Sequence, residues 1–156
     1  MSVQIILFAF AIGVVAGLRA ALPLAALSGA ARVGWLSLAA TPLAFVATPV
    51  ASYLTTAFAA FELVGDTLPA APSRKQLLGF ATRIVTGGFA GAVLGASLGA
   101  LWIGILPGII GAVAGTLGGY AMRARLAATF GRDLPAALLE DAIAIVACYM
   151  IVSHAY

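Results

Sequence analysis

The sequence predicts an all-α, polytopic transmembrane helix bundle that forms a single domain over residues 1–156. Hydrophobic residues make up 63% of the chain and charged residues only 8%, whereas roughly a quarter of a soluble domain is charged. The mean hydropathy is +1.14. Charge is absent from Met1–Leu18, Val33–Phe61 and Ile84–Met122, and the last stretch is long enough for two crossings at about 20 residues each.

Charges and prolines divide the chain into five predicted spans, at about residues 3–20, 43–64, 78–100, 107–126 and 135–155. Pro107 and Pro135 suit the first turn of a helix, where the missing N–H is not needed. Asp133 is placed to cap the last helix and to favour its positive dipole end. The apolar segment Pro23–Trp35 is too short to cross, so we expect a short interfacial or re-entrant helix there.

Basic residues indicate the orientation of this five-span bundle. The loops after the second and fourth spans share one side and collect Arg74, Lys75, Arg123, Arg125 and Arg132, whereas the other side has Arg19 and Arg32. Short basic loops stay cytoplasmic. We therefore expect a multi-pass membrane protein with a cytoplasmic N-terminus and with His154 and Tyr156 outside. An extra crossing near residues 20–40 would reverse the N-terminus.

Glycine recurs at every fourth residue on the third and fourth predicted helices. The stripes consist of Gly87, Gly91, Gly95 and Gly99, and of Gly111, Gly115 and Gly119. Small-residue stripes let helix backbones approach closely in lipid, so we expect glycine-zipper packing within or between protomers. The alternative is that they line a pore or substrate path. Five short spans enclose little volume, which favours a homo-oligomer.

The chain also carries a faint internal repeat. Residues 12–17 (IGVVAG) resemble residues 110–115 (IGAVAG), and residues 22–27 (LPLAAL) resemble residues 134–139 (LPAALL), in the same order. In the five-span topology the first and fourth helices run in opposite directions, which is the relation of inverted repeats in many transporters. Chance similarity in Ala/Gly/Leu-rich sequence is the alternative.

Charged residues at similar depths on several helices form the candidate substrate or proton site. They are Glu62, Asp66, Arg83, Arg123, Glu140 and Asp141. An uncompensated charge in the hydrocarbon costs roughly 2.5–3.5 kcal/mol on insertion scales, so such residues pair or face the bundle interior. Arg19 is expected apart, near the opposite face, unless the first helix is broken or displaced. A purely structural ion network is the competing interpretation.

The stretch Phe61–Arg74 has the features of a specified turn. Gly65 can end the second helix in a left-handed conformation, Pro69 and Pro72 keep the loop after it extended, and Ser73 can cap the start of the third helix. Either this is a well-built turn or it gates the cytoplasmic mouth, with Arg74 at its end.

Other classes of function find little support. Cys148 is the single cysteine and His154 the single histidine, so neither a disulfide within the chain nor a metal site is expected. Basic residues are scattered rather than striped, which argues against nucleic acid. We expect no enzyme activity and no cofactor.

The turn after Phe61, together with residues 17–19, Arg83 with the glycines after it, and Glu140-Asp141, resembles a bacterial family of small membrane proteins known as domain of unknown function 4126. The resemblance covers nearly the whole chain and implies localisation in the bacterial inner (cytoplasmic) membrane without an activity. Members tend to have Lys in an Asp-Lys-x-Pro turn, where this chain has Thr67, so no role of that lysine can be carried over.

The sequence thus predicts a small transporter or channel-like protein for a small polar or ionic solute, with protons coupled through buried carboxylates. The solute and membrane lipid are its possible partners. The alternative is a structural or accessory subunit, or a lipid-binding scaffold without transport. The two differ in what Glu140→Gln should do, because it would stop flux in the first and disturb assembly in the second.

Overall fold

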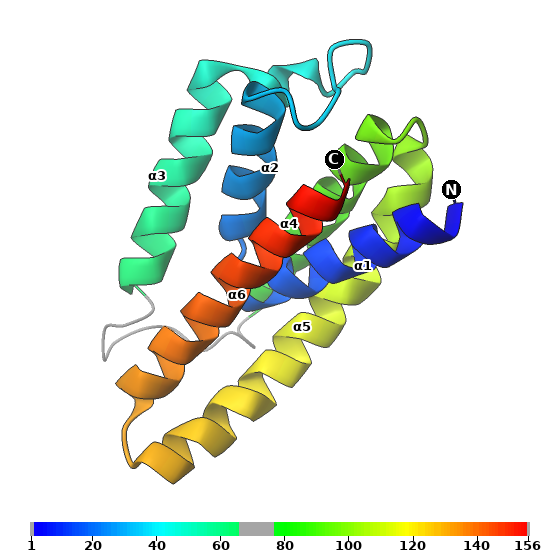
Figure 1. The fold of residues 1–156 in the computed structure, drawn as a ribbon. Coiled ribbons are helices and arrows are strands. Elements are labelled where there is room, and N and C mark those ends of the chain that lie inside the picture. Colours follow the sequence, from blue (N-terminus) through cyan, green and yellow to red (C-terminus); the bar gives the residue numbers. More distant parts are fainter. Residues whose placement is uncertain (1, 66–76, 156) are drawn as a thin grey trace.

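A computed structural model describes residues 2–65 and 77–155, and in these ranges the chain is helical (Figure 1). The elements are α1 (Ser2–Leu18), α2 (Leu22–Arg32), the 3-10 helix η1 (Ala44–Ala47), α3 (Pro49–Gly65), α4 (Leu77–Ser97), α5 (Leu101–Phe130) and α6 (Asp133–Ala155). The predicted all-α class is confirmed. Three helices, α4, α5 and α6, are long and apolar enough to cross a membrane, and α1 is a shorter apolar helix.

Each predicted span overlaps one of these helices, although the second contains η1 as well as α3, and two positions need correction. Pro107 lies inside α5, not in its first turn, because the helix already begins at Leu101. A membrane helix tolerates such a proline where neighbouring groups satisfy the freed backbone. Gly99 does not belong to the stripe on α4, because that helix ends at Ser97 and Gly99 has φ +79° in the turn between α4 and α5.

Helices α1, α4 and α5 form the core of the bundle, and glycines set their spacing. A β-carbon on Gly91 of α4 would overlap the backbone of Gly104 on α5, and one on Gly87 would lie 2.8 Å from the carbonyl oxygen of Gly108. Gly95 is equally constrained, because its β-carbon would lie 2.7 Å from the carbonyl oxygen of Ala100. These contacts lie within one protomer and permit close backbone packing.

Helices α1 and α5 cross in the same direction, so the expected inverted relation of these two helices is wrong. Gly13 on α1 meets Gly108 on α5, and four residues later Gly17 meets Ala112. Contacts that advance together along both chains require parallel helices, and Figure 1 shows both running away from the end that holds the termini. The physical reason is α2. This helix carries the chain back in the opposite direction at a point where the five-span topology had no crossing.

The contacts between α1 and α5 are also reciprocal under the internal repeat. Gly13 packs on Gly108, while its counterpart Gly111 packs on Phe10, which corresponds to Gly108. The pairs Gly17 with Ala112 and Gly115 with Val14 behave in the same way. Such exchange is the signature of a local two-fold axis. The two similar segments on α1 and α5 therefore run in parallel.

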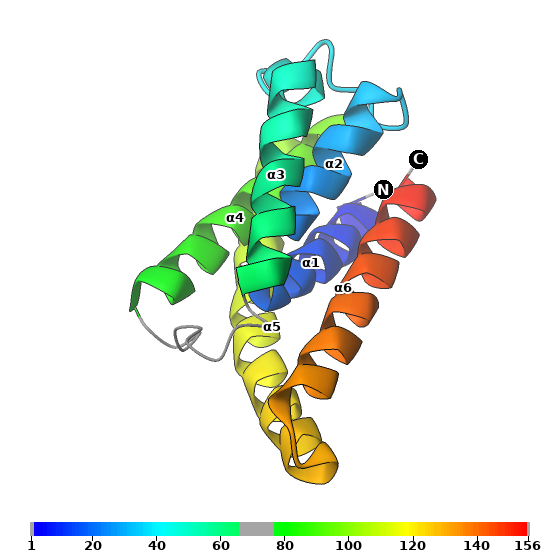
Figure 2. The same ribbon diagram turned by 90° about the vertical axis from the view of Figure 1, so that its left-hand side faces the viewer.

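The two chain ends lie near each other at one end of the molecule (Figures 1 and 2). At the opposite end, α5 turns into α6 at Gly131, whose φ of +69° ends the helix in a left-handed conformation. The expectation of one cytoplasmic and one external terminus does not fit this arrangement. The cause is again the short α2, whose return places Ala44 and Pro49 at the end that holds the termini.

Helix α3 is attached to the bundle mainly through α2 and η1. Its buried residues are Ser52 and Ala59, whereas Tyr53, Phe58 and Phe61 are exposed. A helix with this little buried surface presents an apolar face to lipid or to another protein. Its other end is held by Glu62, which contacts the chain between α1 and α2.

Candidate functional site

The site is built around the break between α1 and α2, where the chain reverses direction after Leu18. Arg19 lies in this break and is 0% exposed. Its Nε donates a hydrogen bond to Oδ1 of Asp141 on α6 (2.5 Å), and its terminal nitrogen forms an ion pair with the same oxygen. Arg19 does not sit apart, because the first helix is broken after Leu18, which is the exception the sequence analysis allowed, and the break turns Arg19 toward Asp141 of α6.

Glu62 of α3 satisfies the backbone at the same break. Its Oε1 accepts the N–H of Ala20 (2.7 Å) and its Oε2 accepts the N–H of Ala21 (2.8 Å). These amides precede α2, whose first turn has no side-chain cap of its own. A carboxylate at the positive end of a helix is favourable. Glu62 therefore caps α2 from a different helix and ties α3 to the charged site.

Glu140 forms a second ionic group with Arg123 of α5 and Asp133. Arg123 donates two hydrogen bonds to the Asp133 carboxylate (2.9 and 2.6 Å), and its NH1 lies 3.7 Å from Oε2 of Glu140. Glu140 is 0% exposed, whereas the Asp133 side chain is 62% exposed. Asp133 is the first residue of α6 and binds Arg123 across the turn. The pairing buries Glu140 about 10 Å from the start of α6.

Thr116 is a member of the site that the sequence analysis missed. Its buried hydroxyl donates to the carbonyl oxygens of Ala112 (2.8 Å) and of Gly17 (3.2 Å), two residues before Arg19. It therefore fastens the end of α1 to α5. The only signal in the sequence was a lone hydroxyl among the glycines of α5.

Arg83 is buried on α4, and its NH1 donates to the carbonyl of Gly79 one turn earlier (3.3 Å). The turn expected to gate the site is described only at its start, where Gly65 ends α3. Its other predicted residues lie outside the described part of the chain, namely Asp66, Pro69, Pro72, Ser73 and Arg74.

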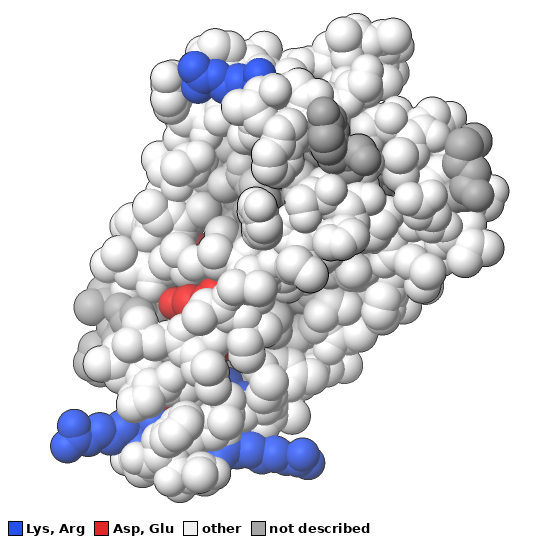
Figure 3. Space-filling view, viewed as in Figure 1, with Lys and Arg blue, Asp and Glu red and all other residues white. Residues whose placement is uncertain are grey.

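Acidic and basic residues lie in different parts of the surface (Figure 3). Acidic atoms appear in a hollow between α3 and α6, and basic side chains project at the two ends of the molecule. The Asp141 side chain is 12% exposed, so this carboxylate is the partly accessible partner of the buried arginine. Arg32 ends α2, while Arg125 and Arg132 are exposed around the turn between α5 and α6.

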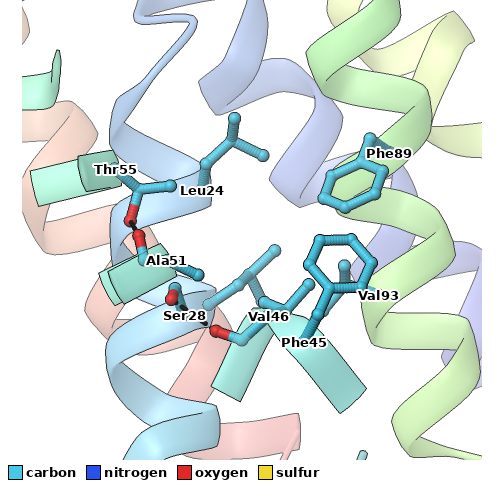
Figure 4. Close-up of a pocket in the computed structure, with 9 residues that line it drawn as sticks. Leu24, Ser28, Phe45, Val46, Ala51, Thr55, Phe89 and Val93 are labelled. Atoms are coloured by element: carbon cyan, nitrogen blue, oxygen red, sulfur yellow. Dashed lines mark hydrogen bonds between the residues drawn. The ribbon is translucent and has the colours of Figure 1, made fainter. Parts of the chain in front are cut away.

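A small cavity of ≈ 60 Å³ lies between α2, η1, α3 and α4 (Figure 4). The hydroxyl of Ser28 donates to the carbonyl of Val46 (2.6 Å), and that of Thr55 to the carbonyl of Ala51 (2.8 Å). The remaining lining is apolar, including Phe45 and Phe89. We therefore place no polar site there.

In the part of the chain that the structure describes, no three His, Cys, Asp or Glu residues are arranged to hold a metal ion. Cys148 is buried on α6. His154 is exposed, with Nδ1 2.7 Å from the carbonyl oxygen of Met150 in its own helix.

Comparison with known proteins agrees with the resemblance seen in the sequence. The model of the domain of unknown function DUF4126 matches residues 6–156. Neither a curated protein nor a solved structure matches the chain. The match covers the bundle except for the first residues of α1 and includes every described residue of the charged site, and this membrane protein therefore belongs to the DUF4126 family.

Proposed function

We propose that this protein is a small membrane transporter or channel-like protein for a small polar or ionic solute, with protons coupled through its buried carboxylates. One observation carries the proposal. Glu62 binds the backbone amides at the broken α1–α2 junction, and beside it Arg19 binds Asp141. Two of the five acidic residues in the chain thus meet at one helix break.

Placing these charges inside the bundle is energetically unfavourable. Each unpaired charge would cost roughly 2.5–3.5 kcal/mol on insertion scales, and ionisable residues inside membranes mark ion and proton pathways. Packing alone does not require them, since buried ion pairs are often replaceable by apolar residues without loss of stability. Arg19 and Glu140, both 0% exposed, therefore support a function beyond packing.

The geometry matches a recurring way to bind solutes in membranes. Transporters use interrupted helices, whose half-helix N-termini point at anionic groups near the middle of the bilayer. Here the amides of Ala20 and Ala21 point at a carboxylate supplied by Glu62. The chain therefore holds its own anion in the position that a solute's anionic group would occupy.

Protonation of Glu62 would allow a solute to take its place at this position. A neutral Glu62 would lose the charge that favours the positive end of α2, and its hold on the two amides would weaken. Because α3 packs mainly on α2 and η1, release of Glu62 would free the end of α3. Arg19 and the amides would then face an incoming solute, while Asp141 balances the arginine charge.

Orientation follows from the same positive-inside argument, now applied to the observed fold. Arg132 lies in the turn between α5 and α6, and Arg123 and Arg125 lie in the last part of α5 before this turn. We place this end in the cytoplasm. Both termini then lie on the external side of the bacterial inner membrane, which reverses the N-terminus expected from five spans. The exposed apolar face of α3 supports a homo-oligomer.

A scaffold without transport is the second candidate, and a specific observation favours it. Arg19 and Arg123 are both already paired with acids, as in a network that fixes helix register. In a scaffold, removal of Glu62 would lower stability without any solute flux to lose. Stability and flux therefore separate the two functions.

Proton uptake into proteoliposomes tests the proposal, read with an internal pH-sensitive dye under imposed salt gradients. The native chain should acidify or alkalinise the lumen in response to at least one permeant solute, and Glu62→Gln should stop this while the protein stays folded. Arg125→Gln is the matched control at an exposed position. Equal responses of native, Glu62→Gln and empty liposomes would reject transport and leave the scaffold.

A further inference from the structure

A long apolar groove lies between α2 and α6, outside the charged site. Its volume is ≈ 490 Å³, which is within the range of about 300–1,000 Å³ seen for small-molecule sites. One wall is formed by small residues of α2, namely Ala25, Ala26 and Gly29. The other wall is formed by Cys148 and Val152 of α6. The α2 wall runs from Leu22 to Val33, about 16 Å along the helix.

The lining determines what can fill this groove. Water does not occupy an apolar cavity, and Ile145 and Tyr149 on the groove wall are exposed on the flank of a membrane-crossing helix. An apolar groove along the exposed flank of a helix that is long and apolar enough to cross a membrane fits a hydrocarbon chain.

The outer end of the groove has the features of a headgroup site. Trp35 and Tyr149 meet there edge to face, with ring centroids 6.4 Å apart, as expected of aromatic residues at the membrane interface. Arg32 is exposed in the last turn of α2, next to Val33 of the groove wall, and its guanidinium contacts Tyr53 of α3, with a hydrogen bond to the phenol oxygen (3.3 Å) and a distance of 4.8 Å to the ring centroid. It is the only described Arg or Lys at the end that holds both termini, and a guanidinium is well suited to bind phosphate.

We propose that this groove is a binding site for an anionic phospholipid, with one acyl chain between α2 and α6 and the headgroup phosphate on Arg32. Charge complementarity selects the lipid, because a neutral headgroup would gain nothing from the arginine. The inner end of the groove, at Leu22 and Ile145, lies next to Arg19 and Asp141 in sequence. The bound chain would therefore end close to the buried ion pair.

Quenching of Trp35 fluorescence by brominated lipid tests this site. The protein carries Trp102→Phe, which leaves Trp35 as the single tryptophan, and is placed in phosphatidylcholine bilayers. A small fraction of the lipid is either phosphatidylglycerol or phosphatidylcholine, brominated near the headgroup end of one chain. Phosphatidylglycerol should quench at lower mole fraction, by about fivefold for one arginine at the membrane surface, and should saturate.

Two variants make the result specific. Gly29→Leu fills the groove and fits without overlap, because a β-carbon there meets nothing within 4 Å. It should remove the saturable quenching, whereas Gly118→Leu, an equally open position on α5, should not. Arg32→Gln should abolish the preference for phosphatidylglycerol while leaving the fold intact.

Two outcomes would overturn the proposal. Equal, unsaturable quenching by both lipids in the native protein, unchanged by Gly29→Leu, would show random lipid contact. Conversion of a dimer to a monomer by Gly29→Leu, with quenching unchanged, would assign the groove to a second copy of the chain.

Discussion

Arg19 and Asp141 are 122 residues apart in the sequence and form an ion pair in which the arginine is completely buried. The pair joins the break between α1 and α2 to the middle of α6. Glu62 binds the backbone at the same break, so one short segment receives contacts from α3 and from α6. The charges therefore tie this break to two other helices of the bundle.

Loss of one partner of this pair should be more damaging than loss of both. Asp141→Ala leaves Arg19 buried without its carboxylate and should lower the free energy of unfolding by about 3–5 kcal/mol. Arg19→Met combined with Asp141→Leu should recover most of this. Thermal unfolding in detergent, analysed as a double-mutant cycle, measures the coupling. Additive losses from the two sites would show that the pair is not an energetic unit.

Glu62 should protect the amides at the α1–α2 break. In Glu62→Ala, hydrogen exchange of a peptide covering residues 18–24 should become faster, because the N–H groups of Ala20 and Ala21 lose their acceptors. The stability cost should be about 0.5–2 kcal/mol, as for a helix cap. Glu62→Gln keeps one acceptor oxygen and should give an intermediate rate. Unchanged exchange in Glu62→Ala would contradict the capping role.

Close packing of α4 on α5 should make Gly91 intolerant of any side chain. A β-carbon there overlaps the backbone of Gly104, so Gly91→Ala must force the helices apart and lower the melting temperature. Gly118→Ala, which meets open space, should change it little. Melting in detergent compares the two. Similar melting of both variants would mean that the stripe on α4 does not set the helix spacing.

The fold predicts that both termini lie on one side of the membrane. In a Cys148→Ser background, Ser2→Cys and Ser153→Cys should react with a membrane-impermeant maleimide from the same side. Thr129→Cys, near the turn between α5 and α6, should react from the other side. Labelling of Ser2→Cys and Ser153→Cys from opposite sides would support a five-span topology instead.

Much of the helical pattern was readable from the sequence. Uncharged stretches predicted the long helices, and the distance of Glu140 and Asp141 from the start of the last helix predicted that they would be buried. The end of α3 at Gly65 also followed from its sequence, but the left-handed conformation expected of Gly65 is wrong, because its φ is not positive. These features depend on local composition, which exposure to lipid constrains directly.

Other parts depend on contacts that composition does not encode. Residues 22–48 carry a single charge, Arg32, whether they lie at the interface or return through the bundle. The short helix α2 was therefore predicted, but its return through the bundle was not, and the position of Arg19 depends on that return. Gly13 and Gly104 were missed for a related reason, since they belong to no long stripe and matter only because α1 and α4 each pack against α5. The parallel direction of α1 and α5 followed from the same unpredicted return.

Charge movement in proteoliposomes tests the central claim most directly. Native protein and the Glu140→Gln/Asp141→Asn double variant are compared by solid-supported-membrane recording under imposed proton and ion gradients, with folding checked for both. The account predicts currents from the native protein that are lost in the folded variant. Identical traces from the two proteins, or silence of the intact native protein under every gradient, would contradict a transport role for the buried carboxylates.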